Sequence, residues 1–420
     1  MPSPHRLFPP IDPRSGRRRT SKGVESRSSL TANGRIALRR RRFADGQTPI
    51  DQFVDQAQAT LSLGVRQFCC LLNADSPSFA RAANNLARTT GVRLSAELLR
   101  QVVEREGTQV LACSAKAGEL PCPFNAGDCT VNGVSRMYLG CDGFLTSMIT
   151  DAEKKLRRAG ARDRRRHLQH KPRPLPTRKT GSDQRYKELK LVTFYDESHD
   201  HRLVSVTRRN HCAAGRLMRR DGARAGFFDA QEKLGVIDGG PWIINQIKAQ
   251  SLPMTAVSLD FYHLAENVHK AKRSCFGEDD DNDDNDDDDD DDDDPAGDAW
   301  AGRTLHIAKH QGYDPLRDHL LQWRSSLKGQ RHRRAADLLI NYVTDRRELI
   351  DYPRFLKEQW QIGSGPTESQ CNQAPRRVKG RGKRWDPDHA EAVMAIEALE
   401  QSNLTAVYWK TQANLANVTN

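Results

Sequence analysis

The sequence predicts an α/β fold in which a mixed β-sheet carries flanking helices. From about residue 135, apolar runs of strand length alternate with stretches of helical periodicity, in the order strand, hairpin, helix, strand, helix, strand and further helices. At 420 residues the chain is long enough for two or three domains and a buried core. This order of elements is that of a ribonuclease-H-like fold, and an α/β fold of another topology is the alternative.

The first 45 residues are rich in proline, serine and arginine. Up to Arg42 they contain twelve Lys or Arg residues and two acids. A segment of this kind cannot bury enough apolar surface to fold, so residues 1–45 are predicted to be a disordered basic arm. The arm would bind nucleic-acid phosphates without sequence specificity, or would serve only to keep the protein in solution.

Residues 46–110 show three helical patterns. The first starts near Pro49, the second runs from Ser76 to Gly91, and the third runs from Ser95 to Gly107. The short connection between the second and third resembles that of a helix-turn-helix, so the region is predicted to bind DNA. A small helical domain that does not read DNA is the alternative.

The strands of the predicted sheet lie within residues 130–265, the first part of the core. Leu189–Tyr195 and Leu203–Thr207 flank a turn and are predicted to form a β-hairpin. A basic, proline-containing insert, Lys154–Lys179, precedes this hairpin and is predicted to be an exposed arm or linker. The other strands each run into an aspartate: Val131–Cys141 before Asp142, Leu234–Ile237 before Asp238, and Thr255–Leu259 before Asp260.

The remaining residues are predicted to be mainly helical. A helical insertion spans 266–355, residues 356–402 complete the core with a catalytic helix and a basic segment, and residues 403–420 form a tail. Within the insertion, Glu278–Asp294 contains one Glu, fourteen Asp and no base. Fifteen like charges repel one another and cannot be desolvated, so 278–298 is predicted to be a disordered acidic loop.

The formal net charge of +11 conceals how basic the rest of the chain is. Without the acidic run, 66 Lys and Arg residues face 40 acids, which leaves a charge of +26. A body this basic predicts a polyanionic partner, DNA or RNA. No apolar run approaches the ~18–20 residues of a membrane span. The nine cysteines lack zinc-ribbon spacing and are typical of reduced thiols. We therefore expect a soluble, cytoplasmic, nucleoid-associated protein with no membrane partner.

Three acids lie at the ends of predicted elements. Asp142 and Asp238 each follow a strand and precede a glycine, and Glu368 lies about one turn into a helix that Pro366 begins. Two strand-end carboxylates can meet a helix-borne one at a sheet edge and supply hard oxygen ligands for two Mg²⁺ or Mn²⁺ ions. Two such metals would activate water or a 3′-hydroxyl and stabilise the leaving oxygen. Taken singly, however, an Asp-Gly pair is an ordinary turn.

Asp260 and His263 compete for the second position in this set. They are three residues apart at a strand-to-helix junction and can share a face. His263 is a candidate metal ligand or proton-transfer group, or a structural histidine. Asp260 is a candidate for a residue that holds the metal ligands in position without binding the metal itself.

A run of cations with one aromatic side chain follows the catalytic helix. Six of them are expected to contact phosphates, and the tryptophan is expected either to pack in the core or to stack on a base. These residues are Arg376, Arg377, Lys379, Arg381, Lys383, Arg384 and Trp385.

Four motifs resemble, in this order, those of the Kra-type insertion-sequence transposases, DDE enzymes related to the Mutator-like group. The motifs are Asp238-Gly-Gly-Pro-Trp-Ile, Leu259-Asp-Phe-Tyr-His-Leu-Ala-Glu, Ile362-Gly-Ser-Gly-Pro-Thr-Glu-Ser and Lys383-Arg-Trp. The resemblance covers about residues 50–400. It departs from the family in lacking amino-terminal zinc-ribbon cysteine pairs, and in carrying the acidic run and the basic insert.

This resemblance implies a ribonuclease-H-like catalytic domain with an all-helical insertion between the second Asp and the Glu. By matching motifs it implies that Asp142, Asp238 and Glu368 are the catalytic triad. The Asp-x-x-His pair, Asp260 and His263, resembles the Cys-x-x-His element of Mutator-like relatives. The match around Asp142 is the weakest of the three.

The sequence therefore predicts a metal-dependent DNA transposase of a mobile element. It would cleave the ends of an insertion sequence, join them to target DNA through the freed 3′-hydroxyl, and act on DNA as a homo-oligomer. The alternatives are a catalytically inactive, transposase-derived DNA-binding protein, and a nuclease or resolvase on the same fold.

Overall fold

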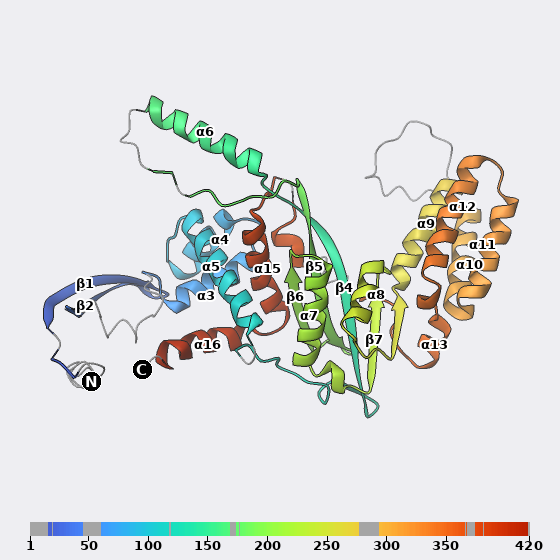
Figure 1. Ribbon diagram of the computed structural model, residues 1–420, viewed down its shortest axis with the longest axis horizontal. Helices are drawn as coiled ribbons and strands as arrows, with labels where there is room; N and C mark the ends of the chain where they lie inside the picture. Colours follow the sequence, from blue (N-terminus) through green and yellow to red (C-terminus); the bar gives the residue numbers. More distant parts are fainter. Residues whose placement is uncertain are drawn as a thin grey trace. The chain divides into compact units, whose positions relative to one another are not determined.

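The computed structural model divides the chain into two compact units (Figure 1). The sheet unit comprises Phe124–Phe144 and Leu189–Gln373, and the helical unit comprises Met1–Pro123, Leu145–Glu188 and Ala374–Asn420. The residues that the structure describes are 16–18, 20–44, 60–116, 119–168, 174–175, 177–276, 294–365, 367, 374–380 and 382–418.

A six-stranded mixed sheet forms the centre of the sheet unit. Its strand order is β6-β5-β4-β7-β8, and the short strand β3 pairs with β4. β5 and β6 are antiparallel, whereas β4, β7 and β8 are parallel to one another. The prediction of a mixed sheet with a hairpin is therefore confirmed. The strands are β3 (Thr130–Val131), β4 (Val134–Ser147), β5 (Tyr186–Asp196), β6 (Arg202–Thr207), β7 (Glu232–Ile237) and β8 (Ala256–Leu259).

Helical crossovers connect the parallel strands. α7 (His211–Arg224) and a short 3₁₀ turn, η1 (Phe227–Asp229), lead from β6 to β7, and α8 (Pro241–Ala249) leads from β7 to β8. Parallel neighbours require crossovers of this kind because a tight turn can join only antiparallel strands. α7 packs on β6 and on α8, so the two helices flank the sheet.

The described residues between β8 and α13 are mainly helical, and the all-helical insertion stays a prediction because residues 277–293 lie outside the described part of the chain. α9 to α12 lie side by side in Figure 1 and share a core in which the rings of Trp300 and Trp323 are 4.0 Å apart. None of the described helices combines the length and apolar character that a bilayer span requires. The elements are α9 (Phe261–Phe276), α10 (Pro295–Gln311), α11 (Tyr313–Ser326), α12 (Gln330–Asp345), η2 (Arg347–Leu349) and α13 (Tyr352–Lys357).

The acidic run borders this bundle. Residues 277–293 lie outside the described part of the chain. Asp294, however, is the N-cap of α10 and accepts a hydrogen bond from the Ala296 N–H (2.9 Å), and Pro295 occupies the first helical turn. The predicted loop boundary at residue 298 is therefore wrong, because capping starts the helix at Pro295.

The helical unit is built on a small set of packed helices. α4 ends at Gly91 as predicted, and Ser95 caps α5 as predicted. The first predicted helix, near Pro49, lies mostly outside the described residues. The elements are α3 (Leu63–Ala74), α4 (Phe79–Thr90), α5 (Ala96–Ala115), α6 (Asp151–His167), η3 (Ala374–Arg377), α15 (Pro387–Gln401) and α16 (Thr405–Val418).

α5 does not end at Gly107 but continues for two further turns. A Cβ atom at position 107 would lie 1.9 Å from the carbonyl oxygen of Ala392 on α15. The glycine is therefore a point of close helix packing, and the prediction that it terminates α5 is wrong. α3, α4 and α15 all pack on α5. α5 keeps an exposed face that includes Gln101 and Arg105, so DNA binding by this region stays a prediction.

We expect Gly107→Ala to destabilise the helical unit by about 1–3 kcal/mol, because the methyl group meets backbone atoms that no rotamer change can move. Urea unfolding followed by circular dichroism measures the effect. Gly160→Ala on α6 is the matched control, since nothing lies within 4 Å of a Cβ at that position. This control should stabilise the protein by up to about 1 kcal/mol. Equal effects of the two substitutions would contradict the packing argument.

The basic arm contains a β-hairpin, so the prediction that residues 1–45 are disordered is wrong for Ser21–Phe43. β1 (Ser21–Thr31) and β2 (Gly34–Phe43) pair antiparallel and form the long ribbon in Figure 1. Asn33-Gly34 is a strong signal for a tight hairpin, and the high charge of the segment obscured it. The Leu30 N–H donates to the Thr60 carbonyl (2.7 Å) and anchors the ribbon to the chain before α3.

Three further segments differ from their predicted structure. Residues from Ala374 onward belong to the helical unit rather than completing the sheet core. The supposed tail includes α16, where the hydroxyl of Tyr408 donates to Glu106 (3.1 Å) on α5. The basic insert contains the helix α6, and none of the described residues of α6 is buried. Its exposure was predicted, and its helical structure was not.

Candidate active site

Three aspartates belong to three neighbouring parallel strands: Asp142 lies inside β4, Asp238 directly follows β7 and Asp260 directly follows β8. The register of β4 and β7 pairs residues that are 96 apart, such as Leu139 with Gly235, and Asp142 and Asp238 are also 96 apart. The register of β7 and β8 pairs residues that are 22 apart, as are Asp238 and Asp260. Laterally paired residues of parallel strands share a face, about 4.8 Å apart from strand to strand. Continued by a few residues, these registers place the three acids in one row across the sheet. The prediction that Asp142 follows its strand is wrong, however, because β4 continues to Ser147.

Asp238 occupies the middle of this row. Its carboxylate accepts a hydrogen bond from the Gly240 N–H (2.8 Å). Burial and the negative charge of Asp142 raise the pKa of Asp238, whereas Gly240, His263 and Arg346 oppose the shift. Burial and a neighbouring like charge both disfavour the ionised form. Asp142 and Asp238 thus form a carboxylate pair that favours a nearby cation.

Asp260 is committed to internal hydrogen bonds. It is fully buried, and it accepts from the Tyr262 N–H (3.0 Å), the Ser364 N–H (3.3 Å) and the Ser364 hydroxyl. Its carboxylate also contacts His263 Nδ1 at 3.0 Å. Burial raises the pKa of Asp260, but these hydrogen bonds outweigh it and hold the pKa below its ordinary value. With its oxygens occupied, Asp260 is suited to positioning neighbouring groups.

His263 lies beside both Asp260 and Asp238. The hydrogen bond to Asp260 is the main cause that raises the pKa of His263 to about 9, and the charge of Asp238 acts in the same direction. The side chain is therefore a cation at neutral pH, and an imidazolium is a poor metal ligand. Its geometry favours a role in balancing the negative charge of the aspartates.

We expect the stability contributed by His263 to depend on pH. Because folding raises its pKa from an ordinary value of about 6.5 to about 9, the contribution should be complete below about pH 6.5 and lost as the pH rises through about 9. Urea unfolding of the wild type and His263→Gln at about pH 6, 7.5 and 9.5 measures it. The difference between the two proteins should shrink with rising pH; a constant difference would show that the ion pair does not stabilise the fold.

Arg346, which sequence reasoning missed, belongs to the same edge. It follows α12, its guanidinium lies 3.9 Å from the ring centre of Tyr342, and its charge acts on Asp238. The Nε atom is buried and has no hydrogen-bond partner in the described structure. A Cβ on Gly239 (φ +75°) would lie 2.5 Å from that Nε, so only glycine admits the arginine there. No local motif marks Arg346, because the fold alone brings α12 to the sheet.

Glu368, the third predicted acid, lies outside the described residues. Its predecessor, Thr367, is buried against the sheet: a Cβ on Gly140 would lie 1.8 Å from the Thr367 hydroxyl oxygen. Gly140 is on β4, two residues before Asp142. The chain entering this segment is fixed as well, because the Phe261 N–H donates to the Ile362 carbonyl (2.9 Å).

A different group of side chains reaches ligand spacing. Among the described residues, Cys129, Asp196 and His201 are the one group of three whose potential metal-ligand atoms all lie within 4.8 Å of one another. Sequence reasoning missed this group. The polar turn of the predicted hairpin, which carries Asp196, was the available signal. The aspartate row does not reach that spacing in the described residues, so the prediction of Mg²⁺ or Mn²⁺ stays a prediction.

Two members of the predicted DNA-binding run lie in the core of the helical unit. The Trp385 indole N–H donates to the Val378 carbonyl (2.9 Å), and its ring packs edge-on against Phe79. Arg377 lies over the Phe79 ring (4.1 Å) and donates to Asn73 (2.9 Å). Burial lowers the pKa of Arg377 to about 10. Of the two roles considered for Trp385, the structure supports core packing, and a phosphate contact by the buried Arg377 is wrong.

The rest of the run is closer to the surface. Arg376 and Lys379 are exposed, and the Nζ of Lys383 donates to the Arg376 carbonyl (2.9 Å). Arg384 forms an ion pair with Glu153 on α6 (2.6 Å), and Arg381 lies outside the described residues. The exposed cations of this run remain candidates for phosphate contact.

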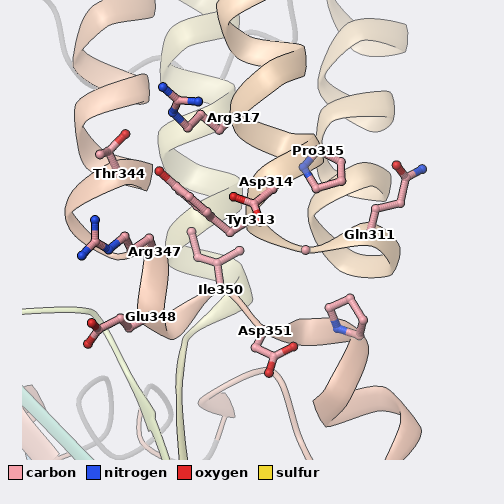
Figure 2. A pocket seen from close by; sticks show the side chains of 12 residues that line it. Gln311, Tyr313, Asp314, Pro315, Arg317, Thr344, Arg347, Glu348, Ile350 and Asp351 are labelled. Atoms are coloured by element: carbon pink, nitrogen blue, oxygen red, sulfur yellow. The ribbon is translucent and has the colours of Figure 1, made fainter.

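A pocket of about 810 Å³ lies elsewhere in the sheet unit, at the end of the helical insertion. Figure 2 shows its side chains coming from α11, the end of α12 and the chain before α13. Arg317 and Arg347 share it with three acids, Asp314, Glu348 and Asp351. Its lining includes none of the aspartates of the sheet edge, and its mixed charge indicates no ligand class.

Known proteins offer no guide to this site: no protein-family model matches the chain, and neither does any curated protein. The geometry of the sheet edge is therefore the basis on which a function can be argued.

Proposed function

We propose that the chain is a DNA transposase that cleaves insertion-sequence ends and joins them to target DNA by metal-dependent phosphoryl transfer. The observation that carries the proposal is the level placement of Asp142 and Asp238 on adjacent parallel strands. Burial is the main cause that raises the pKa of Asp238, and the charge of Asp142 acts in the same direction. Paired carboxylates at a strand-end edge of a basic protein are what phosphoryl transfer on nucleic acid needs.

The strand arrangement supports a ribonuclease-H-like interpretation of the sheet. An antiparallel hairpin (β5 and β6) lies on one side of β4, and two parallel strands with helical crossovers lie on the other. The described helices that follow β8 agree with the all-helical insertion that the family resemblance implies. Fold alone does not determine function, so the chemistry of the site decides the proposal.

The residues at the edge fit a hard divalent cation. Asp142 and Asp238 offer carboxylate oxygens, and Glu368 is the third candidate ligand. When bound, Mg²⁺ or Mn²⁺ would act as a Lewis acid that activates a hydroxyl nucleophile and stabilises the leaving oxygen. A cation would relieve the repulsion that raises the pKa of Asp238. Arg346, whose positive charge acts on Asp238, is suited to attract a phosphate beside the carboxylates.

Asp260 is the positioning residue of this proposal. Its two hydrogen bonds to Ser364 tie the end of β8 to the segment that leads to Glu368. The oxygens of Asp260 are occupied by these hydrogen bonds, so Asp238 is the better choice for the second catalytic acid. His263 would hold Asp260 in place and offset the negative charge of the site.

The β1–β2 ribbon supports DNA as the partner. Arg35, Arg39 and Arg41 alternate along β2, pair with residues of β1 on one face and are all exposed. Successive side chains of a strand point to opposite faces, so these three share one. A two-stranded ribbon fits the major groove of DNA. The exposed basic helix α6 offers a second cationic surface on the helical unit.

We expect the triple substitution Arg35→Gln, Arg39→Gln and Arg41→Gln to weaken binding to duplex DNA of any sequence. The salt dependence of binding is the slope of log K against log salt concentration. The magnitude of this slope should fall by about 2–3, because each lost phosphate contact lowers it by about 0.9. Fluorescence anisotropy with a labelled duplex over a salt series measures the slope. The control is the substitution of Arg331, Arg333 and Arg334 at the start of α12 by Gln. It removes the same charge and should change the slope little. Equal effects would contradict a specific role of the ribbon.

The test of the proposed activity uses purified full-length protein and DNA containing the genomic segments that flank the reading frame. We expect strand cleavage that needs Mg²⁺ or Mn²⁺, followed by covalent joining of the cleaved 3′ ends to a target plasmid. Labelled ends resolved on denaturing gels report both steps.

Other results would select the alternatives. Metal-dependent cleavage that is never followed by joining would indicate a nuclease or resolvase on this fold. Binding without cleavage at any metal concentration would indicate an inactive DNA-binding protein derived from a transposase. Two-ended products require two active sites, so their appearance would also show that a homo-oligomer acts on DNA.

A further inference from the structure

Cys129, Asp196 and His201 lie close together at the turn between β5 and β6. Cys129 precedes β3, Asp196 ends β5 and His201 precedes β6. Their potential ligand atoms lie within 4.8 Å of one another, and His201 Nδ1 is 2.9 Å from the Asp196 carboxylate. Cys129 is 1% exposed. All three belong to the sheet unit.

The turn between β5 and β6 holds two of these groups rigidly. The Asp196 carboxylate accepts hydrogen bonds from the His201 N–H (3.1 Å) and the Ser198 hydroxyl (2.8 Å). The Asp196 N–H donates to the His201 carbonyl (3.2 Å), which closes the turn. Burial raises the pKa of Asp196, but the hydrogen bonds from His201 and Ser198 outweigh it and keep the pKa below its ordinary value. These hydrogen bonds fix the position of the carboxylate beside the His201 ring.

A second turn fixes the cysteine. The Asp128 carboxylate accepts from the Asn125 N–H (2.8 Å), and the Cys129 N–H donates to the Ala126 carbonyl (3.3 Å). The Cys129 carbonyl in turn accepts from the Arg136 N–H (2.8 Å) on β4. The sulfur atom is thus positioned by a closed turn and a strand, independently of the histidine and the carboxylate. Two preformed turns that present donors to one point are typical of a ligand site.

We propose that Cys129, Asp196 and His201 bind a zinc ion that clips the segment before β3 to the β5–β6 turn. A thiolate, an imidazole and a carboxylate together favour Zn²⁺ over Mg²⁺ or Ca²⁺. Tetrahedral zinc with ligand bonds of about 2.0–2.3 Å brings its donor atoms to within about 3–4 Å of one another, close to the spacing observed. On binding, Cys129 loses its thiol proton to solvent and His201 coordinates through a neutral ring nitrogen.

The burial of Cys129 argues against a cysteine nucleophile at this site. The same residue types could form a cysteine nucleophile with a histidine base and an orienting aspartate. Cys129 is buried, which closes its sulfur to any substrate. The His201 side chain is 35% exposed, so water can complete the fourth position from that side. The site is distinct from the aspartate row, whose oxygen donors suit harder cations.

The clip would stiffen the network next to Asp196. Glu197, the following residue, accepts hydrogen bonds from Arg136 (3.1 Å) and Tyr138 (2.6 Å) on β4, and from Gln361 (3.0 Å). The Gln361 N–H also donates to the Tyr138 hydroxyl (3.1 Å). Through this network the zinc site would support the chain that enters the segment before Glu368.

The test is the metal content of untagged, full-length protein purified without chelators and measured by inductively coupled plasma mass spectrometry. We expect about one zinc per chain in the wild type and a loss of most of it in Cys129→Ser and in His201→Asn. Cys212→Ser, at an exposed cysteine on α7, is the matched control and should keep its zinc. Asp142→Asn should also keep it, which separates this site from the aspartate row and from the proposed transposase activity.

A second measurement decides the outcome if a variant does not fold. Wild-type protein with Co²⁺ in place of zinc should show the ultraviolet charge-transfer band of a cobalt–thiolate bond and the visible bands of tetrahedral cobalt. A wild type that contains no zinc above the Cys129→Ser level, or takes up Co²⁺ without a thiolate band, would overturn the proposal.

Discussion

Asp142→Asn and Asp238→Asn should each reduce metal-dependent DNA cleavage by at least about 10³-fold while leaving the fold intact. Each change removes a negative ligand from the centre where charge develops, and losses of this size are typical when one electrostatic contact of an active site is removed. Stability should be unchanged or slightly higher. Burial and the charge of Asp142 disfavour the ionised form of Asp238, and the neutral amide relieves that penalty. Cleavage rates and urea unfolding of the same preparations measure both effects.

The combination of lost activity and retained stability separates a catalytic role from a structural one. Asp260→Asn is the informative comparison, because its carboxylate holds the Ser364 backbone and hydroxyl. We expect it to lower stability as well as activity. Binding of DNA should persist in all three variants, since phosphate contacts by cations dominate affinity. If Asp142→Asn and Asp238→Asn cleave at wild-type rates, the carboxylate pair is not the active site.

Trp385→Ala should destabilise the helical unit by about 3–5 kcal/mol. The indole is 7% exposed, packs against Phe79 and donates to the Val378 carbonyl, and truncating a buried tryptophan leaves a large cavity. Urea unfolding monitored by circular dichroism measures the loss. Arg377 should lose part of its packing in the same variant, because its guanidinium lies over both rings.

Arg384→Ala is the matched control on the neighbouring residue. Its side chain is 37% exposed and forms an ion pair with Glu153, and surface pairs of this kind contribute about 1 kcal/mol or less. DNA binding by Trp385→Ala under conditions in which it remains folded should match that of the wild type. A stable Trp385→Ala protein with weakened DNA binding would instead support base stacking by the Trp385 ring.

The active-site proposal shows what spacing in the sequence can and cannot establish. Asp142 and Asp238 are 96 residues apart. This spacing becomes informative only with the structure, in which each paired residue of β7 is 96 positions after its partner on the parallel strand β4. Asp-Gly after an apolar run marked Asp238 correctly as a strand end, whereas β4 continues beyond Asp142 to Ser147. The order of strands makes β4 the direct neighbour of β7, which brings the two residues to adjacent strands.

Two of the errors result from packing between residues that are distant in the sequence, and two result from local signals that charged tracts obscured. Gly107 resembles a helix end in isolation, yet it lies inside α5 because the α15 backbone approaches it there. Arg377 resembles a phosphate contact, yet the rings of Phe79 and Trp385 enclose it. The acidic and basic tracts suggested disorder by charge alone, whereas Asn33-Gly34 and the Asp294 cap start regular structure at their edges.

The sequence by itself determined the α/β class of fold, the hairpin and the helical crossovers, and the strand ends before Asp238 and Asp260, because periodicity, capping and turn residues act over a few positions. The tertiary structure decided which residues meet. It set Asp142 level with Asp238, enclosed Asp260, brought Arg346 to the sheet edge and collected Cys129, Asp196 and His201 at one point. Those results depend on contacts between segments tens to hundreds of residues apart, and no local pattern encodes them.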